Sequence, residues 1–70
     1  MMNNTYHWIL YMVSAGGQSV SRHFLITKGF SEELIDDCIE KRYIIEVGEN
    51  TLGEPLYIIT DAGRAKRNEQ

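Results

Sequence analysis

Few side chains in this sequence are of the types that catalyse reactions or bind metal ions. The chain has two histidines, His7 and His23, and one cysteine, Cys38. Their spacing matches no zinc site, because zinc ligands usually come in closely spaced pairs. Asp36 and Asp37 are adjacent acids, but neighbouring helical residues point about 100° apart, so they do not form a catalytic dyad. We therefore expect no metal site and no catalytic residues.

Glycines and cysteines, which often belong to phosphate-binding loops and reactive sites, have structural interpretations in this sequence. The glycines at positions 48, 53 and 63 are too widely spaced for a phosphate-binding loop, so we expect them in turns and caps. Cys38 is placed on the apolar side of a predicted helix, and acidic neighbours raise a thiol pKa. It is expected to pack as a small apolar residue. The protein is thus predicted to be non-enzymatic and to need no cofactor.

The charged residues are distributed unevenly along the chain. Residues 31–54 contain eight acidic and two basic residues, a net charge of −6, whereas the remainder sums to +3. This asymmetry bears on binding partners rather than on the fold. At about 100° per residue, four carboxylates share the polar side of a helix over this segment. They are Glu33, Asp36, Asp37 and Glu40.

Hydrophobic patterning predicts the helices that position these residues. Residues 5–15 are apolar on nearly every side and precede two glycines, which predicts a helix. A domain this small rarely surrounds a helix, so two arrangements stay open. Part of the helix meets a second molecule, or one face rests on the hairpin and the rest is partly exposed. Helices at 21–28 and 31–42 are each expected to begin at a capping serine. Lys41 and Arg42 are expected in the last turn of the latter. The inward positions are Phe24, Leu25, Leu34, Ile35, Cys38 and Ile39.

The periodicity changes after residue 42. Residues 43–47 and 56–60 are rich in β-forming types and flank a turn segment at 48–55, which predicts a hairpin. Residues 60–67 predict a short polar helix or a frayed tail. The expected fold is α+β, one domain over 1–70 with an ordered core at about 5–67. No signal peptide or membrane segment is expected, and the single cysteine favours the cytoplasm.

Two segments carry a resemblance to a known family. The run SEELIDDCIEKRYI at 31–44 resembles the third helix and first wing strand of winged-helix domains. The run YIITDAGRA at 57–65 is similar to the segment that closes the wing in MarR-type and PadR-type regulators. Lys28-Gly29-Phe30 departs from the small-residue turn usual between the second and third helices. The resemblance spans about residues 5–67. It implies three helices, a C-terminal hairpin wing, a short C-terminal helix and duplex DNA as ligand.

The charges oppose the DNA implication. Phosphate binding depends on Lys and Arg, but the outward side of the third predicted helix carries the four carboxylates, and the wing adds Glu49 and Glu54. The first hypothesis is therefore a regulatory module that contacts a basic protein surface through these four acids, as an inhibitor or DNA mimic would. The alternative is a solvated helix surface that keeps a small protein soluble.

Two further hypotheses stay open. A DNA-binding transcriptional regulator would use basic residues of the second helix and the C-terminal segment, namely Arg22, His23, Lys28, Arg64, Lys66 and Arg67. The alternative for the last three is that they neutralise a helix end. A homodimer would use the first helix, through Tyr6, Trp8, Tyr11 and Met12. The alternative there is core packing with partial exposure.

Overall fold

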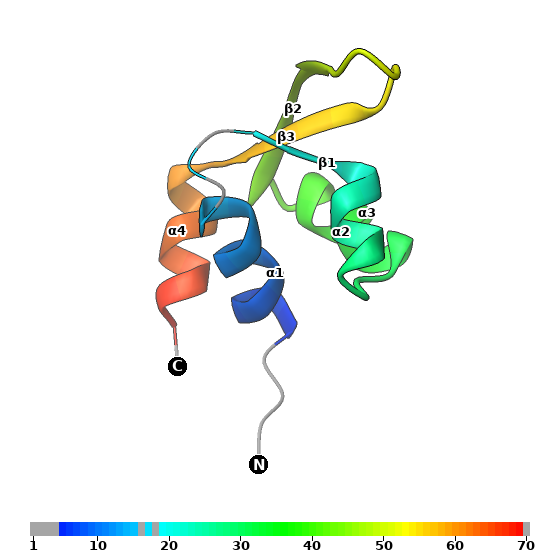
Figure 1. The fold of residues 1–70 in the computed structure, drawn as a ribbon. Coiled ribbons are helices and arrows are strands. Elements are labelled where there is room, and N and C mark those ends of the chain that lie inside the picture. The colour runs from blue at the N-terminus through cyan, green and yellow to red at the C-terminus, as the bar shows by residue number, and fades with distance from the viewer. Residues whose placement is uncertain (1–4, 16, 18, 70) are drawn as a thin grey trace.

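A computed structural model of the protein describes residues 5–15, 17 and 19–69. The elements in chain order are α1 (Thr5–Ala15), β1 (Val20–Ser21), α2 (Arg22–Thr27), α3 (Glu32–Glu40), β2 (Ile44–Glu49), β3 (Pro55–Ile59) and α4 (Asp61–Asn68). Within these residues the fold is a small α+β domain with four helices and one three-stranded antiparallel sheet. In Figure 1, α1 stands between α4 and the α2–α3 pair, and the β2–β3 hairpin projects away from the helices.

The sheet has the order β1-β3-β2, so the short β1 pairs with β3 and not with its neighbour in sequence. The predicted hairpin is confirmed, with pairs running from Ile44↔Ile59 to Glu49↔Pro55. Gly48, which was expected in the turn, lies instead inside β2, where the register shifts at a bulge. Its φ of 143° is open to glycine and rarely to other residues, so glycine suits this irregular position.

The core forms where α1, α3 and the sheet meet. Its buried residues are Ile9, Leu10, Val13, Val20, Leu25, Ile35, Cys38, Ile44 and Tyr57. The domain does not surround the first helix, as expected for a chain of this length. Only one side of α1 enters the core, and Trp8 and Tyr11 on the other side are 56% and 52% exposed. A domain of this size has too little interior to surround a helix.

The predicted serine caps are confirmed at α2 and α3. Ser21 accepts a hydrogen bond from the Phe24 amide at 3.0 Å, and Ser31 accepts one from the Leu34 amide at 3.1 Å. Phe24 was expected to point inward, but its side chain is exposed, with the Lys28 ammonium 5.3 Å from the ring centroid. A helix of six residues is too short to bury two adjacent side chains, and Leu25 takes the inward position.

The end of α3 differs from the prediction. Lys41 and Arg42 are not in the last turn, because the helix ends at Glu40 and Arg42 takes a left-handed φ of 62°. The Tyr43 amide then donates to the Cys38 carbonyl, and the Arg42 amide donates to the Ile39 carbonyl. These two bonds form a Schellman motif, which satisfies the last helical carbonyls and turns the chain into β2.

The junction between β3 and α4 holds the last helix against the rest of the domain. The Thr60 hydroxyl accepts from the Gly63 amide at 3.0 Å, and the Thr60 amide donates to the Tyr43 carbonyl at 3.0 Å. Gly63 is buried, and a Cβ built there would lie 2.1 Å from the Tyr43 carbonyl oxygen. Only glycine therefore allows α4 to approach the α3–β2 turn this closely.

We predict that Gly63→Ala lowers the free energy of unfolding by about 3 kcal/mol, because the added methyl group meets main-chain atoms of Tyr43, and the clash is relieved only if α4 moves away from the α3–β2 turn. Gly53→Ala is the control, since Gly53 has a φ of 79° but open space around it, and it should cost only about 1 kcal/mol. Urea denaturation followed by circular dichroism measures both. Equal losses would show that the contact at Gly63 is not the constraint described.

Candidate functional site

The exposed side of α3 carries the carboxylates predicted from the sequence. Glu33, Asp36 and Glu40 are exposed and Asp37 is half-buried, while Ile35 and Cys38 on the opposite side are fully buried. This arrangement of the helix matches the expected one. The acidic face of α3 is defined here as Glu33, Asp36, Asp37 and Glu40.

Asp36 is paired with a cation from α2. One guanidinium nitrogen of Arg22, Nη2, lies 2.9 Å from the Asp36 carboxylate and 3.1 Å from that of Glu32. The other, Nη1, donates to the Tyr57 hydroxyl at 3.0 Å. The hydrogen bond to Tyr57, followed by those to the two carboxylates, raises the pKa of Arg22. The cation thus joins α2, α3 and β3.

Asp37 is also engaged within the domain. The Tyr6 hydroxyl donates a hydrogen bond to its carboxylate, and the Lys41 ammonium lies 3.0 Å away. These contacts, that of Tyr6 first, lower the pKa of Asp37, while the same carboxylate raises the pKa of Tyr6 and of Lys41. Asp37 therefore links α3 to α1.

The acidic face consequently divides into two structural and two available carboxylates. Asp36 and Asp37 are held by partners, whereas Glu33 and Glu40 have no ion-pair partner among residues 5–15, 17 and 19–69. Both remain exposed to solvent. Only these two acids of the face are free to bind another molecule without giving up an internal contact.

A shallow groove adjoins the end of this face, and sequence analysis did not find it. It has a volume of about 400 Å³ and is lined by Ile39, Glu40, Arg42, Ile44, Ile45 and Glu46. On β2 only Ile44 is buried, and Ile45 and Val47 are 37% and 49% exposed. The only sequence signal for this groove is that apolar and polar residues do not alternate strictly after Ile44. Because residues 43–47 form a β-rich run, that irregularity does not by itself indicate a surface feature.

The structure does not bring the predicted basic residues together. Arg22, His23 and Lys28 lie on or just after α2, whereas Arg64, Lys66 and Arg67 lie on α4. Figure 1 shows these helices on opposite sides of α1. Arg22 is bound to acids of α3, and Lys66 pairs with Glu69 at 3.0 Å. No single continuous phosphate-binding surface therefore forms from all six.

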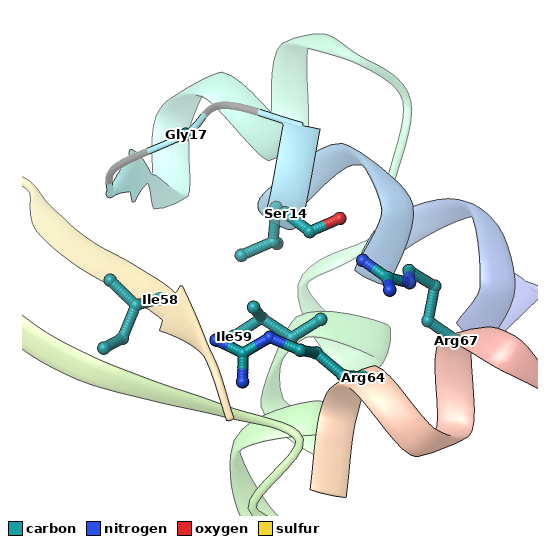
Figure 2. Close-up of a pocket in the computed structure, with 7 residues that line it drawn as sticks. Ser14, Gly17, Ile58, Ile59, Arg64 and Arg67 are labelled. Atoms are coloured by element: carbon teal, nitrogen blue, oxygen red, sulfur yellow. The ribbon is translucent and has the colours of Figure 1, made fainter. Parts of the chain in front are cut away.

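Arg64 and Arg67 do share a cavity, which we call the arginine pocket. It has a volume of about 390 Å³ and lies between the end of α1, β3 and α4. Figure 2 shows the two side chains reaching from α4, that of Arg64 toward β3 and that of Arg67 toward Ser14. Arg64 is paired with Asp61 at 2.7 Å, and Arg67 donates to the Asn68 side chain at 3.1 Å.

The four apolar residues proposed for a dimer do not form one surface. Tyr6 and Met12 are half-buried and pack against the core, and Tyr6 makes an edge contact with Tyr43 at 5.5 Å between ring centroids. Trp8 and Tyr11 are exposed. Trp8 borders a groove of about 510 Å³ that includes Phe30 and Leu34. An interface on α1 is thus restricted to Trp8, Tyr11 and this groove.

The side chains of the types that catalyse reactions or bind metal ions do not cluster in the described residues. Cys38 is buried, and burial, followed by the nearby Asp37 charge, raises its pKa to about 11. Residues 5–15, 17 and 19–69 contain no group of three or more His, Cys, Asp and Glu side chains placed to hold a metal ion. In the same residues, every helix falls short of the length and apolarity that crossing a bilayer requires.

Comparison of the chain with known protein families, curated proteins and solved structures gives no match.

We predict that Arg22→Met lowers the free energy of unfolding by about 2 kcal/mol. The Tyr57 hydroxyl, on a residue only 2% exposed, would lose its partner, and an unsatisfied buried group costs more than an exposed ion pair contributes. Arg64→Met, which breaks only an exposed pair, should cost less than about 0.5 kcal/mol.

A double-mutant cycle, measured by urea denaturation, separates the contribution of the Arg22–Tyr57 hydrogen bond from that of the other Arg22 contacts. If Tyr57 is the partner that matters, Arg22→Met should cost clearly less in the Tyr57→Phe background than in the wild-type chain. Strictly additive losses would mean that the Arg22–Tyr57 contact contributes nothing.

Proposed function

We propose that this chain is a non-enzymatic winged-helix regulatory module that acts by protein contact through the acidic face of α3. Support for the winged-helix assignment comes from the order of its elements and the sheet order β1-β3-β2, with the hairpin as the wing. The segment from Tyr57 to Gly63, which is similar to the segment that closes the wing in winged-helix regulators, adds support, since its Tyr, Thr and Gly each have a structural role. Tyr57 accepts from Arg22, Thr60 caps α4, and Gly63 permits close packing.

The observation that carries the functional proposal is the availability of Glu33 and Glu40. Both project from the helix that would enter a DNA groove in a winged-helix protein, and neither forms an ion pair in the described part of the chain. Uncompensated carboxylates oppose phosphate binding and favour a basic surface. The neighbouring groove offers apolar area from Ile39 and Ile45 together with charges of both signs, from Glu40, Arg42 and Glu46. This combination fits a protein surface, whose interfaces join apolar centres to polar rims.

DNA binding is the weaker alternative. It would have to use α4 and the exposed His23 and Lys28 of the α2 region as separate patches, because Arg22 is bound to Asp36 and Glu32 on the acidic side. Phosphate contacts made from these patches would leave α3 and the hairpin without a role in binding. We therefore favour a protein partner with a basic surface.

The test uses a variant that leaves the structural acids in place. Immobilised wild-type protein should retain a basic protein from cell extract at low salt, and Glu33→Gln with Glu40→Gln should reduce the retained amount at least tenfold. The control is Glu49→Gln with Glu54→Gln, which makes the same charge change on the hairpin and breaks no ion pair. It should retain the partner as the wild type does.

Quantitative mass spectrometry of the retained proteins measures the difference. Unchanged retention by the Glu33/Glu40 variant would contradict the proposal, because the face would then not be the contact. Equal loss in both double variants would contradict it as well, since net charge rather than this face would govern binding. Circular dichroism confirms that each variant is folded.

A further inference from the structure

We propose that the arginine pocket binds a small organic acid, in which a single carboxylate is carried on an apolar body. The pocket lies on the α4 side of α1 and includes none of the acids of α3. It would be a second site, separate from the proposed protein-binding face.

The charged wall of the pocket is suited to a carboxylate. Arg64 and Arg67 are three residues apart on α4, so their side chains leave the same side of the helix. Each has one hydrogen-bond partner in the described part of the chain, through Nη1 of Arg64 and Nε of Arg67. The other guanidinium N–H groups have no protein partner there. Guanidinium groups bind carboxylates through paired, charge-assisted hydrogen bonds.

The pair between Arg64 and Asp61 does not block the site. The Asp61 side chain is fully exposed and the Arg64 side chain is half exposed, and exposed pairs of this kind contribute little. A ligand carboxylate that also contacts Arg67 competes with only one solvated carboxylate. Among the described residues, no acidic side chain lines the pocket itself.

The opposite wall is aliphatic and selects the body of the ligand. Ile58 and Ile59 supply its accessible carbon beside the buried Val13, and Ser14 lies at the end of α1, where its hydroxyl donates to the Tyr11 carbonyl at 3.0 Å (Figure 2). A phosphate ion would place polar oxygens against this wall, whereas an alkyl chain would bury it favourably. The volume of about 390 Å³ falls in the range of small-molecule sites.

The test is an NMR titration of the folded protein, labelled with ¹⁵N, using sodium hexanoate as the probe. Hexanoate should produce saturable shifts concentrated at the amides of Gly17, Ile58, Ile59, Arg64 and Arg67. Arg64→Gln with Arg67→Gln should weaken binding at least tenfold. Lys66→Gln, which removes a charge from the same helix but does not line the pocket, should leave the affinity unchanged.

Two further probes separate the parts of the proposal. Hexanol tests the apolar wall alone and inorganic phosphate tests the charge alone, and each should bind at least tenfold more weakly than hexanoate. The proposal is overturned if hexanoate causes no saturable shifts in the wild type or binds the double variant equally well. It is also overturned if phosphate matches hexanoate, because the apolar wall would then select nothing.

Discussion

A single cation, Arg22, fixes the relation between the helices and the sheet. Its guanidinium contacts Tyr57 of β3 together with Glu32 and Asp36 of α3, and its side chain is only 20% exposed. Because a guanidinium has five donors in a rigid plane, it holds three groups in one geometry. Since Tyr57 lies in the core, this contact ties α3 to it, together with the buried side chains of Ile35 and Cys38.

The same interaction determines what the surface offers to other molecules. Arg22 neutralises part of the acidic face, and because it is engaged there it is not available to bind an anionic ligand. Tyr6 and Lys41 act likewise on Asp37. What remains outward is a pair of free carboxylates on α3 and, across α1, a pair of arginines on α4. The two-sided charge of the sequence thus becomes two separated surface regions of opposite sign.

Local features of the fold were predictable from the sequence because local interactions determine them. Ser21 and Ser31 cap their helices as expected, and the period of α3 places Ile35 and Cys38 inward. The hairpin follows from two β-rich runs around a turn. The acidic face was predictable for the same reason, since helical spacing alone places its four carboxylates.

Features that depend on distant parts of the chain were not predictable. Arg22 meets Tyr57 across 35 residues and Tyr6 meets Asp37 across 31 residues, and no local pattern encodes either contact. The left-handed conformation of Arg42 could not be predicted, because the residue after a helix C-cap that takes this conformation is usually glycine. Arg64 and Arg67 lie beside the same apolar wall only because α4 packs close to the rest of the domain, and Gly63 allows that close packing.

The most direct test of the central claim is a fluorescence titration of the purified protein against a labelled mixed-sequence DNA duplex at low and at physiological salt. If α3 has been adapted to recognise protein, no salt-sensitive binding should occur even at low ionic strength, because its free carboxylates repel phosphate. Tight binding that weakens steeply with added salt would contradict the account. It would make the basic residues, and not the acidic face of α3, the functional surface.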